Sequence, residues 1–220
     1  MVRAQTLSTG WPHAVGLSQR PVETRAARPA TGPGSRSSVG CLARHMIVYR
    51  QADPRFPFLW ESNDQPPARW HGPGEGPVQY FADTPDGAWA EFLRHEGITA
   101  EAELVNVRRA LWAIELPDDL TAEVPRVAQA ILTGGFETHE ECQKEARRLR
   151  NNGAAALRAP CAALLPGSAG GWKVDGGLQP AAARDGTVVA VFGTRPDFVG
   201  WMAAFAARPR SDLLARVRHL

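Results

Sequence analysis

Two arginines, a tyrosine and a glutamate are the residues of this chain whose types and order could do chemistry. Arg50 and Arg69 lie on either side of a proline-rich stretch, and Tyr80 and Glu91 follow within 22 residues. The planar guanidinium of arginine makes paired bonds to phosphate oxygens. A carboxylate can stabilise positive charge that develops in a transition state. Such groups could hold the phosphates of a dinucleotide and stabilise a ribosyl cation.

Each of these residues also has a plainer interpretation. Arg50 and Arg69 could be ordinary surface arginines, since most arginines are exposed. The ring of Tyr80 could stack on a base or on nicotinamide, but a buried tyrosine with a satisfied hydroxyl is more common. Glu91 falls away from the apolar stripe of its expected helix, which comprises Trp89, Phe92 and Leu93. Periodicity alone therefore predicts a solvated glutamate.

The cysteines and histidines do not form a metal-binding pattern. His71, His95 and His139 are scattered, without paired-histidine spacing, so we expect no metal. The cysteines, Cys41, Cys142 and Cys161, are odd in number and widely spaced, which argues against a disulfide framework and a zinc site. Cys161 with a distant histidine could make a thiol hydrolase, although a buried, inert cysteine is the commoner case.

Charge is unevenly distributed along the 220 residues, whose net charge is +2. Residues 1–45 carry six arginines against the single acid Glu23, which gives this segment +5 and leaves −3 for residues 46–220. A basic tail on an acidic body is poor evidence for nucleic-acid binding, and we expect none directly. No apolar run reaches the length of a membrane-spanning helix or of a secretory signal, so the expected compartment is the cytoplasm.

The chain divides into a tail and one domain. Residues 1–45 lack apolar periodicity and are rich in Pro, Gly, Ser and Arg, which predicts a disordered tail, a targeting peptide or an overextended start before Met46. Residues 46–220 alternate strand and helix patterns, which predicts a mixed α/β domain. Strands are expected at 46–50, 78–82, 111–116 and 187–192. A long loop is expected at 53–77, because that stretch holds six prolines.

Helices are expected at three places. Thr84 followed by Pro85 is a helix start signal, and residues 124–132 have an apolar pattern that ends at Gly134 and Gly135. Thr138 and Glu141 have capping-box spacing and predict a polar helix that runs to Arg150. The segment 201–207 fits either a terminal helix or a strand.

From Met46 onward the chain resembles the RES domain, a family named for its arginine, glutamate and serine. The resemblance rests on four pieces in the family's order: Tyr49-Arg50, Ala68-Arg69-Trp70-His71, Gln79-Tyr80-Phe81-Ala82 and Ala88-Trp89-Ala90-Glu91. Two departures stand out. Ala68 replaces a glycine, and Cys161 in Ala159-Pro160-Cys161-Ala162-Ala163 stands where the family has its serine. Ser168, in a Gly-rich loop, is a second candidate for that position.

The resemblance implies an ADP-ribosyltransferase-like fold with a split, curved sheet flanked by helices. It implies catalytic roles for Glu91, Arg50, Tyr80 and Cys161, and substrate contacts for Arg69, Tyr49, Trp70 and Ser168. The implied substrate is NAD, whose nicotinamide–ribose bond would be broken with inorganic phosphate or water as acceptor and without a resident cofactor. Family members include NAD-degrading toxins of bacterial toxin–antitoxin pairs, which implies a small helical antitoxin as partner. Two alternatives stay open: an ADP-ribosyltransferase acting on a macromolecule, and a non-catalytic nucleotide-binding module.

Overall fold

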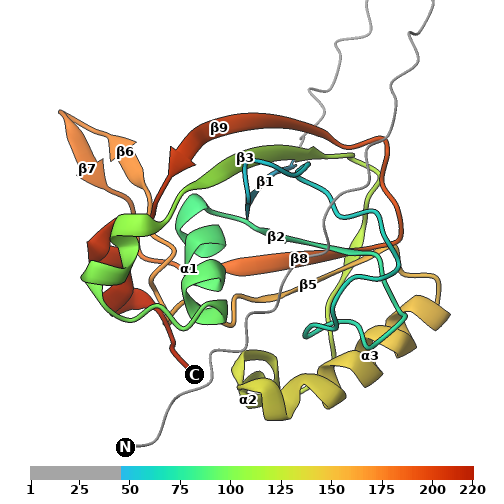
Figure 1. Ribbon diagram of the computed structural model, residues 1–220. Helices are drawn as coiled ribbons and strands as arrows, with labels where there is room; N and C mark the ends of the chain where they lie inside the picture. Colours follow the sequence, from blue (N-terminus) through green and yellow to red (C-terminus); the bar gives the residue numbers. More distant parts are fainter. Residues whose placement is uncertain (1–45) are drawn as a thin grey trace, which may run out of the picture. The chain divides into compact units, whose positions relative to one another are not determined.

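The computed structural model describes residues 46–220, so the prediction for residues 1–45 lies outside the described part (Figure 1). The strands are β1 (Met46–Ala52), β2 (Val78–Ala82), β3 (Arg109–Leu116), β4 (Ala122–Glu123), β5 (Ala156–Pro160), β6 (Trp172–Val174), β7 (Leu178–Pro180), β8 (Thr187–Phe192) and β9 (Val199–Ala207). The α-helices are α1 (Pro85–His95), α2 (Gln129–Thr133) and α3 (His139–Asn151). Short 3-10 helices are η1 (Glu101–Asn106), η2 (Phe136–Thr138) and η3 (Ser211–Arg216).

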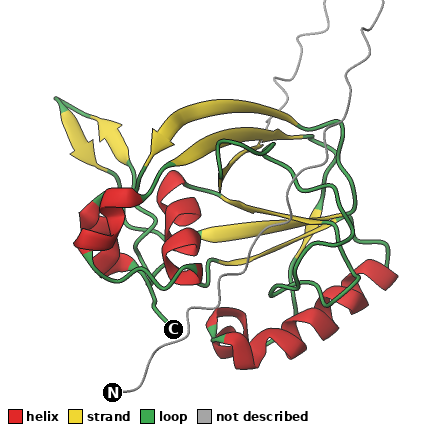
Figure 2. Cartoon of the chain, viewed as in Figure 1, coloured by secondary structure: helices red, strands yellow, loops and turns green. Residues whose placement is uncertain are grey.

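A seven-stranded mixed sheet organises the domain, in the order β4-β5-β8-β2-β1-β3-β9. Neighbouring strands are antiparallel except for β4 and β5, which are parallel. The sheet is not closed into a barrel, since β4 and β9 form its two ends. Helices flank it, with α1 against the central strands β1 and β2 and with α2 and α3 along one side (Figures 1 and 2). The predicted α/β fold class is confirmed.

The sheet divides between β1 and β2. Residues 46–52 of β1 pair one by one with β3, whereas the register between β1 and β2 is given by Tyr49 and Ala82. Figure 1 shows β1, β3 and β9 curving away from β2, β8 and β5 beyond this junction. The residues that follow Tyr49 on β1 therefore lie beside the separation of the two half-sheets. The expected split is present, and it places Arg50 at its edge.

Two hydrophobic clusters lie on the two faces of the sheet. The larger includes apolar side chains of α1, α3 and η3 and one face of the central strands, with Trp89, Leu93, Leu149 and Leu213 among its members. The smaller cluster joins the two half-sheets on the other face, with Val48, Phe81, Ile114 and Val191 among its members. Because adjacent strand residues face opposite sides, β1 and β2 each contribute to both clusters.

Local signals in the sequence placed most of the elements. Thr84 caps α1, since its Oγ1 accepts a hydrogen bond from the Gly87 N–H at 3.0 Å, and Pro85 occupies the first turn. Gly153 has φ of +85° just after α3, as the stop signal predicted. The stretch 53–77 is loop, apart from a bridge between Ala68 and His71 (Figure 2).

Two helix predictions were wrong in detail. The helix expected over 124–132 is confined to Gln129–Thr133, because Pro125 interrupts the pattern. Thr138 does not form a capping box, since its backbone is helical and its hydroxyl donates to the Gly135 carbonyl at 2.8 Å. Helix α3 therefore begins directly after the 3-10 helix η2, without a side-chain N-cap.

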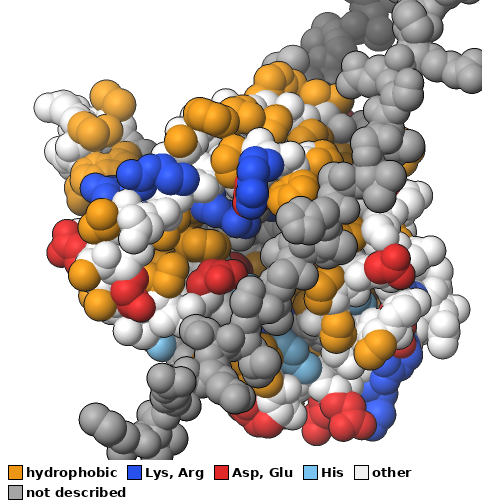
Figure 3. Space-filling model, viewed as in Figure 1, with side chains coloured by type: hydrophobic (Ala, Val, Ile, Leu, Met, Phe, Trp, Pro, Cys, Tyr) orange, Lys and Arg blue, Asp and Glu red, His pale blue; other side chains and the backbone are white. Residues whose placement is uncertain are grey.

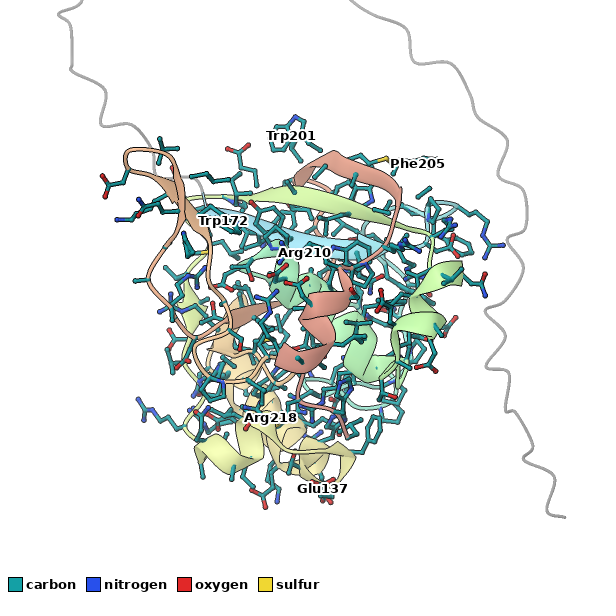
Figure 4. All side chains as sticks on the ribbon, turned by 90° about the vertical axis from the view of Figure 1, so that its left-hand side faces the viewer. Glu137, Trp172, Trp201, Phe205, Arg210 and Arg218 are labelled. Atoms are coloured by element: carbon teal, nitrogen blue, oxygen red, sulfur yellow. The ribbon has the colours of Figure 1, made fainter. Side chains whose placement is uncertain are left out.

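The segment 201–207, left open between helix and strand, belongs to β9. This end strand exposes Val199, Trp201, Met202 and Phe205, and the β6–β7 hairpin exposes Trp172, Val174 and Leu178. Figure 3 shows apolar side chains along the top of the molecule, where β9 runs, and Figure 4 labels three of the aromatic residues. Within residues 46–220, no helix has both the length and the apolar character that crossing a membrane requires.

Candidate functional site

Helix α1 brings Glu91 to the segment that follows β5. Its Oε1 atom accepts a hydrogen bond from the Cys161 thiol, with Sγ at 3.1 Å, and another from the Ala163 N–H at 3.3 Å. Glu91 is half-buried, so the solvated glutamate predicted from periodicity was wrong. The reason is that small residues on α1, Gly87, Ala88 and Ala90, are also buried. An apolar stripe defined by large side chains alone underestimates the buried surface of a helix that also carries small residues.

Cys161 is held as a hydrogen-bond donor. The residue is 4% exposed, and its N–H donates to the Gly186 carbonyl at 2.9 Å. Burial, and then the negative charge of Glu91, raises the pKa of the Cys161 thiol. A nucleophilic cysteine works as a thiolate, so this environment opposes a thiol hydrolase. The thiol acts here as a donor to the Glu91 carboxylate.

Ser168, the other candidate for the family serine, lies in a different environment. Its N–H donates to the Leu165 carbonyl at 3.1 Å, and its carbonyl accepts from Arg216 at 3.4 Å. These backbone contacts form a turn at the base of the β6–β7 hairpin. Of the two candidates, Cys161 contacts Glu91, whereas the hydrogen bonds of Ser168 within residues 46–220 go to Leu165 and Arg216.

Arg50 extends from β1 across the separation between the half-sheets. Its Nη1 donates to Gln79 Oε1 at 2.6 Å, and the same oxygen accepts the Trp60 N–H at 3.1 Å. Burial lowers the pKa of Arg50 to about 10, an effect that Tyr80 partly opposes. The guanidinium is therefore still charged at neutral pH. No carboxylate of residues 46–220 forms an ion pair with it, which leaves a half-buried cation suited to an anion such as phosphate.

Tyr80 uses its hydroxyl to hold the turn that carries Arg69. The hydroxyl oxygen accepts the Trp70 N–H at 3.0 Å and lies 2.8 Å from His71 Nδ1. His71 Nε2 lies 2.9 Å from the Pro66 carbonyl, so Nε2 carries the proton and Nδ1 accepts from Tyr80. Burial raises the pKa of Tyr80 and lowers that of His71, which keeps both groups neutral. The Tyr80 hydroxyl thus has its hydrogen-bond partners within the protein, as in the interpretation of Tyr80 as a packed tyrosine.

Arg69 binds the carboxyl end of α2. Its Nη1 donates to the Ile131 carbonyl at 3.2 Å and to Thr138 Oγ1 at 3.1 Å, and its Nη2 donates to the Gly134 carbonyl at 2.7 Å. Cations are favoured at this end of a helix. Much of its donor capacity is therefore already used, in contrast to Arg50. Arg50 and Arg69, for which the sequence predicted the same role, therefore have different surroundings in the structure.

Sequence analysis missed Arg94. It follows Glu91 by one helical turn, is 6% exposed, and donates to the carbonyls of Ala162, Thr133 and Gly134. Its spacing of three from Glu91 was the one available signal, because residues three apart on a helix are neighbours. Apolar periodicity does not detect such a residue, because a buried arginine is not part of the apolar pattern of a helix.

The two remaining candidates, Trp70 and Tyr49, pack in or against the hydrophobic core. Trp70 is 1% exposed in the larger cluster, and Tyr49 is half-buried against the same cluster. Within residues 46–220, no three His, Cys, Asp or Glu side chains gather in a way that could hold a metal ion. Glu91, the partner of Cys161, lies on the same helix as Arg94, which shares the Gly134 carbonyl with Arg69. Arg50 lies at the sheet separation, where its partner is Gln79.

Comparison with known proteins identifies a family and several similar solved structures. The model of the RES domain matches residues 47–204, a range that contains all eight candidate residues. A crystal structure of the M. tuberculosis MbcT–MbcA toxin–antitoxin complex matches with 17% identity and a TM-score of 0.47, over 78% of this chain and 87% of that one. A search of curated proteins gave no match.

Proposed function

Because the chain belongs to the RES domain family, we propose that it is an enzyme that breaks the nicotinamide–ribose bond of NAD, with inorganic phosphate or water as acceptor. The observation that carries the proposal is the contact of 3.1 Å between Cys161 Sγ and Glu91 Oε1. It joins the positions at which the resemblance expects the glutamate and the serine. These residues are 70 positions apart in the chain, so local sequence does not impose their contact.

Glu91 is assigned the central role in bond cleavage. As the bond breaks, its electron pair leaves with the nicotinamide nitrogen, which becomes neutral, and positive charge develops on the ribose carbon. A carboxylate beside that carbon stabilises the charge more in the transition state than in the ground state. A phosphate or water oxygen then supplies the electron pair of the new bond, and water loses its proton to solvent.

Arg50 and Cys161 are assigned supporting roles. Arg50 is a half-buried cation with a neutral partner, so it would bind a substrate phosphate or an incoming inorganic phosphate. The Cys161 thiol would fix the orientation of the Glu91 carboxylate rather than attack the substrate. Tyr80 would act indirectly, because its hydroxyl positions the turn of Arg69. Tyr49 and Trp70 would shape the surroundings of these groups.

The proposal extends to a biological role as the toxin of a toxin–antitoxin pair. The resemblance to the RES domain supports this role, because members of that family include NAD-degrading toxins. The partner would be a small helical antitoxin that covers the site and prevents NAD loss. Co-expression of a neighbouring gene product of that kind should relieve growth arrest caused by this chain. Growth arrest that persists in the Glu91→Gln variant would contradict the link between toxicity and this site.

The experiment that tests the activity is NAD consumption by the purified full chain, with and without inorganic phosphate. Phosphate-dependent loss with a phosphorylated ADP-ribose product indicates phosphorolysis, and loss without phosphate, giving free ADP-ribose, indicates hydrolysis. Transfer of label from tagged NAD to a macromolecule would identify an ADP-ribosyltransferase instead. NAD binding by a folded sample without turnover would identify a non-catalytic module and overturn the proposal.

A further inference from the structure

Two arginines converge on the peptide group that donates to Glu91. The carbonyl oxygen of Ala162 accepts hydrogen bonds from Arg94 Nη1 and from Arg218 Nη1, the latter at 2.7 Å. Ala162 itself is buried, at 4% exposed. Figure 4 shows Arg218 below η3 and above the helices at the bottom of the view, close to the end of the chain. Arg94 reaches the same oxygen from α1.

The geometry of a peptide unit connects these arginines to the glutamate. The Ala162 carbonyl and the Ala163 N–H belong to one planar unit and point in opposite directions. On one side the carbonyl faces two guanidinium groups, and on the other the N–H donates to Glu91 Oε1 at 3.3 Å. Hydrogen bonds in such a chain polarise one another, so cations on the carbonyl strengthen the N–H as a donor.

We propose that Arg94 and Arg218 are positioning residues that act on Glu91 through the Ala162–Ala163 peptide. They fix the orientation of this peptide and, with it, the segment from which the Cys161 thiol also donates. The inference rests on the proposed function for its effect on turnover, and it adds two residues to that site. Neither arginine needs to contact substrate.

Arg94 also anchors the end of α2, which is a purely structural function that must be separated from the positioning role. Its contacts with the Thr133 and Gly134 carbonyls, at 3.3 and 2.5 Å, would be lost in any truncation. Arg218 offers a cleaner variant, because its hydrogen bond is to the Ala162 carbonyl. Arg108 provides a matched control, since it is an exposed arginine that donates to the Val105 and Val107 carbonyls, beyond the segment that faces Glu91.

The first test is a kinetic cycle of Arg218→Met, Arg94→Lys and Glu91→Gln. Arg218→Met should lower kcat about tenfold with little change in KM, as expected for loss of an interaction realised in the transition state. In the Glu91→Gln background the same substitution should change kcat by less than about twofold, because residues of one unit are not additive. Arg94→Lys keeps a cation on the carbonyl and should retain more than half of the activity. Arg108→Met should not change kcat.

Equal losses of kcat from Arg218→Met in both backgrounds would overturn the proposal, because a merely structural effect does not require the Glu91 carboxylate. A rise in KM with unchanged kcat would overturn it as well. Either result leaves the proposed function standing if the unchanged chain consumes NAD.

The second test does not depend on activity. Loosening the Ala162–Ala163 peptide should expose the Cys161 thiol, so iodoacetamide should alkylate Cys161 at least about fivefold faster in Arg218→Met, as local opening becomes easier. Cys142, which is 0% exposed on α3, is the internal control and should keep its rate, as measured by peptide mass spectrometry. An unchanged rate at Cys161, or equal acceleration at both cysteines, would contradict the positioning role. This result stands even if the chain does not turn over NAD.

Discussion

The thiol of Cys161 donates a hydrogen bond to the carboxylate of Glu91 across 3.1 Å, although one residue lies on α1 and the other follows β5. The contact fixes a carboxylate beside a weak donor in a half-buried position. A hydroxyl would serve as a stronger donor in the same place.

Replacement of Glu91 by glutamine should leave the fold intact and lower NAD turnover at least about a hundredfold, in line with the loss of one preorganised electrostatic group. Steady-state NAD consumption measures the effect, and thermal unfolding checks the fold. Glu96→Gln, at the exposed end of the same helix, should keep full activity. Retained activity in Glu91→Gln would remove the glutamate from the proposed mechanism.

Replacement of Cys161 by serine should preserve or raise turnover, because the hydroxyl is a better donor to Glu91 than the thiol. Cys161→Ala removes the donor and should lower turnover. Comparison of kcat for the two variants measures the value of the hydrogen bond. A folded but inactive Cys161→Ser would indicate a role that only sulfur can fill, contrary to our interpretation.

Loss of the Arg50 cation should weaken NAD binding. Arg50→Met removes a charge-assisted hydrogen bond to phosphate, so Kd should rise at least about tenfold. Titration calorimetry in the Glu91→Gln background measures Kd without turnover, and Arg55→Met, which removes an exposed arginine paired with Asp53, is the control. Because the pKa of Arg50 is about 10, affinity should be constant around neutral pH and fall as the pH rises through that value. An unchanged Kd in Arg50→Met would place the phosphates elsewhere.

Removal of the Tyr80 hydroxyl should destabilise the fold. Tyr80→Phe leaves the Trp70 N–H and His71 Nδ1 without their partner, which should lower the free energy of unfolding by about 2 kcal/mol. Urea denaturation measures this difference. Tyr49→Phe, the other tyrosine near the sheet separation, should cost less than about 0.5 kcal/mol. Equal costs for the two variants would show that the network around Tyr80 adds nothing specific.

Stability should fall between pH 6.5 and pH 5 because of His139. Burial, with the nearby cations Arg69 and Arg94, lowers the pKa of His139 to about 4. An unfolded histidine has a pKa of about 6.5, so in this range the unfolded chain binds a proton that the folded chain does not. The resulting loss of unfolding free energy is about 1.5 kcal/mol over this range, since the unfolded histidine is only half protonated at pH 6.5. Urea unfolding at both pH values measures it, and His139→Gln should reduce the slope more than His95→Gln, an exposed control. Equal slopes of unfolding free energy against pH in all three proteins would contradict a half-buried His139 that stays neutral in the folded chain.

The sequence by itself determined the elements that depend on local rules. Thr84 and Pro85 start α1 because a capping side chain and a fixed φ act on adjacent residues. The strands 78–82 and 187–192 follow from short-range apolar patterns, and six prolines exclude regular structure from 53–77. The order of the motifs also identified the family, because it requires only the linear arrangement of residues. The same local rules failed at 124–132, where the helix begins only at Gln129, and at Thr138, where a 3-10 turn precedes the helix.

The tertiary structure decided which groups meet. Periodicity placed Glu91 in solvent, but burial of the small residues around it and the return of the chain after β5 put it against Cys161 and Ala163. From sequence, Arg50 and Arg69 were both candidates for phosphate binding, yet one is a half-buried cation with a neutral partner and the other binds the end of α2. Arg94 and Arg218 converge on one carbonyl from positions 124 residues apart. Such contacts depend on packing between distant segments, and no local pattern of residues encodes them.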